Sequence, residues 1–176
     1  MLKVLDVGSG TGSEVDKIFT GQLYEVTKLD VNRRVKPDIR HDITKPLPKK
    51  YQSKFDAAVC FHFLEHVDRA LVISVMINIA GAVKPGGQIW VTVPSFEWAA
   101  REIMAGRDNS AVQYIVFGAQ FNPWDYHRIG FTLGALKEVI TRAGLEIEVA
   151  CQQDIIVHVQ DTKCEALQNL VKARKR

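Results

Sequence analysis

The 176-residue sequence has three cysteines, no long hydrophobic run and little net charge. Cys60, Cys151 and Cys164 are far apart and odd in number, which fits neither a disulfide framework nor the paired spacing of a zinc site. We therefore expect no metal site and a reducing, cytoplasmic location. A net charge of +3 is too small to indicate a nucleic-acid partner.

The longest apolar stretch, "ALVISVMINIAGAV" (70–83), is interrupted by Ser74 and Asn78 and is too short to span a bilayer. The first residues carry too few apolar side chains to form a signal peptide. We therefore expect no membrane partner. A hydrophobic content of 47% and a charged content of 24% are typical of a globular domain, and the length suffices for one domain with its own core.

The hydrophobic pattern predicts alternating strands and helices. Strands are predicted at 2–7, 24–30, 38–43, 55–61, 88–93, 145–150 and 154–160, and helices at 13–20, 67–83, 132–143 and from 162 onward. This alternation favours a parallel sheet with helices on both faces. We expect a single domain over 1–161 and a helical, basic tail at 162–176. Eight of the fifteen aromatic residues fall in a less regular insert at 95–131, which is either a satellite core or a lid over an acceptor pocket.

A glycine-rich turn follows the first strand in "LDVGSGTG" (5–12), and Asp6 stands two positions before its first glycine. Such turns bring backbone amides close to a ligand. Ligands of open parallel sheets lie at the carboxyl ends of the strands. We therefore expect the turn, Asp30 at the end of the second strand and Phe61–His62 after the fourth to face one crevice.

Two kinds of cofactor compete for this crevice. An acidic residue about twenty positions after the glycines, here Asp30, is typical of a dinucleotide site. However, the spacing is G-x-G-x-G, and Asp6 would place a negative charge beside a diphosphate. S-adenosylmethionine has no phosphate and carries two positive groups, which Asp6 attracts directly or through water. The residues therefore favour S-adenosylmethionine.

Six segments, in order along nearly the whole chain, resemble a class I S-adenosylmethionine-dependent methyltransferase of the type 11 group. They are "LDVGSGTG" (5–12), "KLDVN" (28–32), "HDITKPLP" (41–48), "FDAAVCFHFLEHV" (55–67), "VKPGGQIWVTVP" (83–94) and "HRIGFTLGALKEVITRAGL" (127–145). The resemblance implies an α/β fold, a Rossmann-like three-layer sandwich with a mostly parallel seven-stranded sheet whose last strand is antiparallel.

The same resemblance implies a set of cofactor-binding residues. They are Gly8, Ser9, Gly10 and Gly12 at the methionine and ribose, Asp6 at the ammonium side, Asp30 at the ribose hydroxyls, Val31 beside the adenine, Asp42 and Ile43 at the adenine edge, and Phe61 and His62 near the methionine. Relatives often carry helices before the first strand, where this sequence begins. We therefore expect the cofactor to be covered by 95–131, by a partner chain or by a segment outside this sequence.

Acceptor-side chemistry is expected at "DYHRIGFT" (125–132). His127 has a side chain suited to taking a proton near neutrality, Tyr126 lies beside it, and Arg128 is able to bind an anionic acceptor. The alternative is that His127 only fastens the insert to the core. His62, Glu65 and His66 cluster after the fourth strand, where packing and a chemical role both remain open.

These observations predict a methyltransferase that acts on a small-molecule acceptor, which the sequence does not identify. The Asn/Asp-Pro-Pro-aromatic motif of amino-methylating DNA enzymes is absent after the fourth strand, where the sequence reads "FHFLEH". Two alternatives are a non-catalytic S-adenosylmethionine-binding subunit and a dinucleotide-dependent oxidoreductase. The helix at 67–83 has apolar residues on more than one face, which favours a homo-oligomer.

Overall fold

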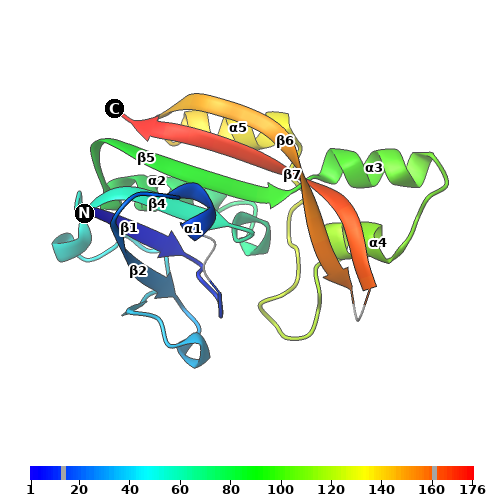
Figure 1. Cartoon of the computed structure of the whole chain (residues 1–176), viewed down its shortest axis with the longest axis horizontal. Helices are drawn as coiled ribbons and strands as arrows, with labels where there is room; N and C mark the ends of the chain where they lie inside the picture. Colours follow the sequence, from blue (N-terminus) through cyan, green and yellow to red (C-terminus); the bar gives the residue numbers. More distant parts are fainter. Residues whose placement is uncertain (13–14, 160–161) are drawn as a thin grey trace.

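The computed structural model of the chain describes residues 1–12, 15–159 and 162–176, which form a seven-stranded sheet with helices on both faces (Figure 1). The strands are β1 (Leu2–Val7), β2 (Tyr24–Asp30), β3 (Ile39–Arg40), β4 (Phe55–Phe61), β5 (Val83–Pro94), β6 (Leu145–Val159) and β7 (Thr162–Lys175). Their order in the sheet is β3-β2-β1-β4-β5-β7-β6; β7 runs antiparallel to both β5 and β6, and the other pairs are parallel. The predicted fold class is therefore confirmed.

The order of the strands reverses between β1 and β4, and open α/β sheets bind ligands at such a switch point. The helices are α1 (Val15–Ile18), α2 (Val72–Ala82), α3 (Phe96–Met104), α4 (Ser110–Phe117) and α5 (Leu133–Arg142), with 3₁₀ turns η1 (Arg33–Val35), η2 (Lys49–Tyr51) and η3 (Leu64–His66). Side chains cap α3 and α5: Ser95 accepts from the amide of Trp98, and Thr132 accepts from that of Ala135. Among the described residues, no helix is both long and apolar enough to cross a membrane.

The core has one large and one small layer. The large layer packs α2 and α5 against the sheet and includes Leu5, Met76 and Leu136, all fully buried. The small layer lies on the opposite face, where Val15 of α1 meets Val59 of β4. Because α2 contacts both the sheet and α5, it needs apolar residues on more than one side, so its pattern does not by itself require a second subunit.

The C-terminal segment differs from the sequence-based expectation. Residues 162–176 were predicted to form a helical tail, and this is wrong: 162–175 form β7, between β5 and β6. The segment is rich in helix-forming Ala, Leu, Lys and Arg. Hydrogen bonding to strands on both edges and the burial of Leu170, Val171 and Ala173 override that propensity.

The positive charges of this segment have partners within the sheet. Lys172 and Arg174 both pair with Glu148 on β6, and the Lys175 ammonium donates to the carbonyl of Val83 at 2.7 Å. These charges are therefore paired within the sheet.

Three other element predictions need correction. The helix predicted over 67–83 is shorter, because Val67 after the turn η3 is extended and α2 covers only Val72–Ala82. The strands predicted at 145–150 and 154–160 are one strand, β6, which ends at Val159 among the described residues. The helix predicted over 13–20 covers 15–18, and its predicted cap, Ser13, lies outside the described residues.

The insert at 95–131 forms the expected satellite core, while its role as a lid stays a prediction. Trp98 and Tyr114, on α3 and α4, pack against the far end of the β6–β7 hairpin and form a satellite core with Val112 and Ile115. By contrast, Phe121 and Trp124 are 80% and 57% exposed in the loop between α4 and α5. This loop lies near the carboxyl ends of the parallel strands (Figure 1). The insert therefore packs α3 and α4 against the β6–β7 hairpin and also places an exposed loop beside the expected cofactor crevice.

Candidate functional site

A cavity of about 590 Å³ lies at the carboxyl ends of β1, β2 and β4; we call it the first cavity. The side chains and backbone that line it include Gly8, Gly10, Asp30, Val31, Asn32, His41, Asp42, Ile43, Thr44, His62, Phe63, His66, Asp68, Asn122, Trp124, Asp125 and Arg128. Its described lining contains four aspartates and one guanidinium, Arg128, which is paired with Asp68 at 2.6 Å. The cavity is therefore strongly acidic.

The glycine-rich turn forms one wall of the first cavity. Gly8 has a φ of +68°, and a Cβ atom there would lie 2.3 Å from Cδ2 of Phe63. Gly10 has a φ of +53° with nothing within 4 Å of the position of a Cβ. Both therefore favour glycine, Gly8 through a close approach as well as its conformation. The Gly10 amide donates to Oδ2 of Asp30 at 3.0 Å, which fastens the turn to β2.

Two carboxylates face the first cavity from β2 and from the loop after β3. Asp30 accepts from the amides of Gly10 and Asn32, at 3.0 and 2.8 Å, one on each oxygen. Asp42 accepts from the amide and the hydroxyl of Thr44 at 3.1 and 2.7 Å. The Thr44 hydroxyl lowers the pKa of Asp42, and this outweighs the effect of burial. These bonds leave each carboxylate with spare acceptor positions for a ligand.

The structure brings most of the predicted cofactor-binding residues to this cavity. Seven of them line it: Gly8, Gly10, Asp30, Val31, Asp42, Ile43 and His62. Four do not. Asp6 and Ser9 are buried behind the turn, Gly12 is exposed beyond it, and the side chain of Phe61 packs with the small core layer on the other face of the sheet. The lining residues Phe63, Asn32 and Trp124 were not predicted.

A second cavity, of about 730 Å³, adjoins the first and shares His62, His66 and Asp125 with it. It is lined further by Glu65, Tyr114, His127 and Gln168, and by residues 154–158 of β6. The insert and the hairpin thus form the walls of the second cavity, and two histidines stand on the boundary between the cavities.

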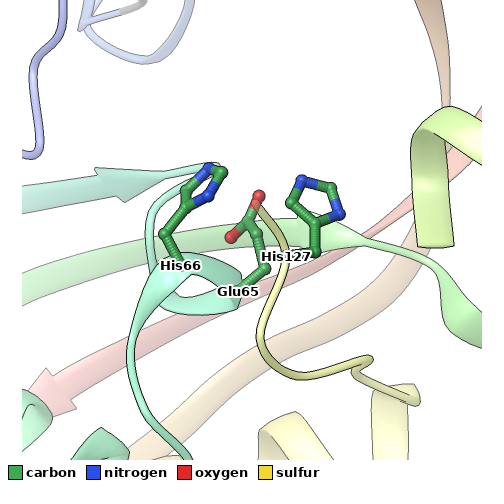
Figure 2. Close-up of side chains that lie close together, drawn as sticks. All are labelled: Glu65, His66 and His127. Carbon is green, nitrogen blue, oxygen red and sulfur yellow. The ribbon is translucent and has the colours of Figure 1, made fainter. Parts of the chain in front are cut away.

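Glu65 lies at this boundary, between His66 and His127 (Figure 2). Its side chain is 2% exposed, and neither of its oxygens makes a hydrogen bond with the described residues. Nδ1 of a third histidine, His62, is 3.5 Å from Oε1 of Glu65. Burial acts to raise the pKa of Glu65, but His62, His66 and His127 together bring that pKa below its ordinary value. Glu65 is therefore a buried carboxyl group surrounded by three imidazole rings.

The two histidines in Figure 2 are oriented by backbone carbonyls. Nδ1 of His66 lies 3.1 Å from the carbonyl oxygen of Tyr126, and Nδ1 of His127 lies 2.9 Å from that of Ile115. A carbonyl only accepts, so Nδ1 carries the hydrogen in both rings, and in the neutral form of each ring the lone pair is on Nε2. Burial lowers the pKa of His127, and Glu65 offsets this only in part. The lowered pKa favours the neutral ring.

The acceptor-side residues predicted in the loop after α4 have different positions. His127 is part of the second cavity, and Arg128 lines the first. Tyr126 is 47% exposed and lines neither cavity, so a catalytic role for it stays a prediction. The loop is fixed to η3, because the amides of Arg128 and Ile129 donate to the carbonyl of Glu65 at 2.7 and 3.3 Å.

Comparison with known proteins agrees with this geometry. No curated protein is matched by the sequence. Among solved structures, an S-adenosylmethionine-dependent methyltransferase from Methanosarcina mazei has 19% identity and a TM-score of 0.68 over 99% of this chain and 92% of its own. A second structure, from work on the conversion of a disulfide bond into a thioacetal group in echinomycin biosynthesis, has 17% identity and a TM-score of 0.71 over 99% and 76%.

A third similar structure is the 1,6-didemethyltoxoflavin N1-methyltransferase of Burkholderia thailandensis, with bound 1,6-didemethyltoxoflavin and S-adenosylhomocysteine. It has 18% identity and a TM-score of 0.65 over 99% of this chain and 71% of its own. At these identities the structures show a shared fold. A family model described as a methyltransferase domain matches residues 2–150. The chain belongs to this family of methyltransferase domains.

Proposed function

We propose that the chain is an S-adenosylmethionine-dependent methyltransferase that binds the methyl donor in the first cavity and a small-molecule acceptor in the second. The observation that carries the proposal is the acidic lining of the first cavity. Asp30, Asp42 and Asp125 face it, and the guanidinium of Arg128 is engaged by Asp68. Such a lining suits a ligand with sulfonium and ammonium groups and opposes a diphosphate.

The residues present fit this cofactor. The turn at Gly8–Gly10 allows the backbone to approach a ligand closely, and Asp30 keeps acceptor positions for two ribose hydroxyls. Asp42 and the amide of Ile43 are placed for the adenine edge, as the family resemblance implies.

S-adenosylmethionine supplies a methyl group on a positively charged sulfur, which a nucleophile displaces in line. The protein therefore has to align the two reactants and exclude water. His62 and His66, which border both cavities, mark where donor and acceptor would meet. The lone pair on Nε2 of His127 is available to an acceptor in the second cavity. Trp124 and its loop supply the cover expected from the insert.

Calorimetry tests the donor assignment. We expect S-adenosylmethionine and S-adenosylhomocysteine to bind with a stoichiometry of one and NAD⁺ not to bind. Tight binding of NAD⁺ would instead support the dinucleotide-dependent alternative. Cofactor binding with no transfer of labelled methyl across a broad panel of hydroxyl, amine and thiol acceptors would support the non-catalytic subunit. Self-association stays a prediction, which light scattering tests against the 19.8 kDa monomer.

A further inference from the structure

We propose that Glu65, His66 and His127 bind a divalent first-row transition metal ion at the boundary between the two cavities. Each residue offers one ligand atom, and these atoms all lie within 4.8 Å of one another. Figure 2 shows the two imidazole rings on either side of the carboxylate. The sequence analysis predicted no metal site from the number and spacing of the cysteines, and it did not consider a site made of His127 with the distant Glu65 and His66.

The orientation of the rings is that of metal-binding histidines. In most such sites one ring nitrogen donates to a carbonyl or carboxylate, which leaves the other nitrogen to bind the metal. Here Nδ1 of both His66 and His127 is paired with a backbone carbonyl, at 3.1 and 2.9 Å. The Nε2 atoms are therefore the ones available to a cation.

Glu65 gives the second, independent observation. A buried carboxylate normally accepts several hydrogen bonds, and leaving it without them costs several kcal/mol. Glu65 is 2% exposed, and neither of its oxygens accepts a hydrogen bond from the described residues. A cation between the carboxyl group and the two Nε2 atoms would supply the missing partner for these buried oxygens. The competing explanation is a protonated His62, whose Nδ1 lies 3.5 Å from Oε1.

The ligands need only small movements to reach bonding distance. Ligand atoms about 2.0–2.1 Å from a tetrahedral metal are about 3.4 Å apart, so contraction from 4.8 Å requires shifts of about 1 Å or less for each side chain. The backbone is already joined at this point, because the amide of Arg128 donates to the carbonyl of Glu65 at 2.7 Å. Two imidazoles and one carboxylate suit zinc, iron(II), cobalt(II) or manganese(II).

Three protein ligands leave at least one coordination position open, and the two cavities are adjacent to it. If the proposed methyltransferase function holds, an acceptor hydroxyl would bind there and lose its proton to solvent, because a bound metal lowers the pKa of a coordinated hydroxyl. The acceptor oxygen would then form the new O–CH₃ bond as the S–CH₃ bond breaks, with the electron pair remaining on sulfur. In this mechanism the acceptor atom is an oxygen that binds the metal, and His127 holds the metal and does not act as the base.

The test uses Co²⁺ with the full chain after chelation, without cofactor or acceptor. We expect calorimetry and visible absorption to show one Co²⁺ per chain, with a Kd in the micromolar range or below. His66→Gln and His127→Gln should each weaken binding by about tenfold or more. His158→Gln is the matched control, because His158 lines the second cavity but is not among the three ligands, and it should bind Co²⁺ like the parent.

Absence of stoichiometric binding, or full binding by both the His66 and the His127 variants, would overturn the proposal. A thiolate-to-cobalt absorption band would also overturn it, because it would place the ion at a cysteine. Circular dichroism checks that each variant is folded. Glu65→Gln should also weaken Co²⁺ binding, and if this variant does not fold, the two histidine variants alone decide the test. Binding of S-adenosylhomocysteine to the parent protein is measured in parallel and separates the two proposals. If the parent does not bind it, this result counts against the methyltransferase function and not against the metal site.

Discussion

The backbone amide of Gly10 donates a 3.0 Å hydrogen bond to Oδ2 of Asp30, twenty residues further along the chain. This bond joins the turn after β1 to the end of β2, so the two walls of the first cavity are positioned by one contact. The carboxylate is held on its other oxygen by the amide of Asn32 at 2.8 Å. Asp30 therefore orders the turn and also faces the ligand.

Replacement of Asp30 by alanine should weaken S-adenosylhomocysteine binding roughly 10- to 150-fold, which corresponds to the 1.5–3 kcal/mol of hydrogen bonds to a charged group. Asp38→Ala is the matched control, because Asp38 also accepts from a backbone amide, that of Lys28, but lies outside the first cavity. Calorimetry should show parent-like affinity for this control. Equal affinity of the Asp30 variant and the parent would refute the assigned role.

The glycine turn offers a test that separates backbone strain from ligand contact. Gly10 and Gly21 both have positive φ and open space at the position of a Cβ, so Gly10→Ala and Gly21→Ala should each destabilise the fold by about 1–2 kcal/mol. Only Gly10 lines the first cavity, so only its variant should lose cofactor affinity, by about tenfold or more. Urea unfolding and calorimetry measure the two effects, and a similar affinity loss in both variants would contradict the model of the turn.

The site shows where sequence reasoning succeeds and where it stops. Asp30 was predicted to face the crevice because the end of a strand in a parallel sheet has a known position, whereas Asp42 was assigned from the family resemblance; both line the first cavity. Phe63 and Trp124 were not, since their places depend on how η3 and the α4–α5 loop fold over the sheet. The segment 162–175 reads as a helix by composition, and only pairing with both β5 and β6 makes it a strand. The Glu65–His66–His127 cluster depends on a long-range contact between η3 and that loop.

Trp124 should report cofactor binding directly, because it lines the first cavity while it remains 57% exposed. We expect its fluorescence to change when S-adenosylhomocysteine binds. Trp124→Ala should weaken binding about 2- to 12-fold, the loss expected when one aromatic contact is removed. Phe121→Ala is the control, because Phe121 is 80% exposed in the same loop and does not line the cavity. An unchanged affinity in the tryptophan variant would remove this loop from the cofactor site.

Asp56 should make the stability of the sheet depend on pH. Its carboxylate accepts from the Lys84 ammonium at 2.7 Å and from the Lys3 amide at 2.8 Å, and these bonds lower its pKa. A depressed native pKa adds stability above the unfolded value of 3.8, and this stability is lost as the pH falls through the native pKa. Asp56→Asn should therefore cost about 1 kcal/mol at pH 7, and nothing below the native pKa. Urea unfolding at several pH values, with exposed Asp16→Asn as control, measures this; a constant difference at all pH values would contradict it.

His127 separates three roles that the second cavity allows: a base, a metal ligand and a structural anchor. His127→Gln should leave S-adenosylhomocysteine affinity within about twofold, because His127 does not line the first cavity. If His127 is a base or a metal ligand, His127→Gln should slow methyl transfer by about 10²-fold or more.

A chelation experiment on the parent protein distinguishes the base role from the ligand role. Chelation followed by dialysis should abolish methyl transfer only if a metal is required, and added Co²⁺ should then restore it. The anchor role predicts something else: loss of the 2.9 Å bond to the Ile115 carbonyl should lower the melting temperature, with activity falling only in proportion to the unfolded fraction. A variant that is fully folded, binds the cofactor and transfers methyl at the parent rate would exclude His127 from the chemistry.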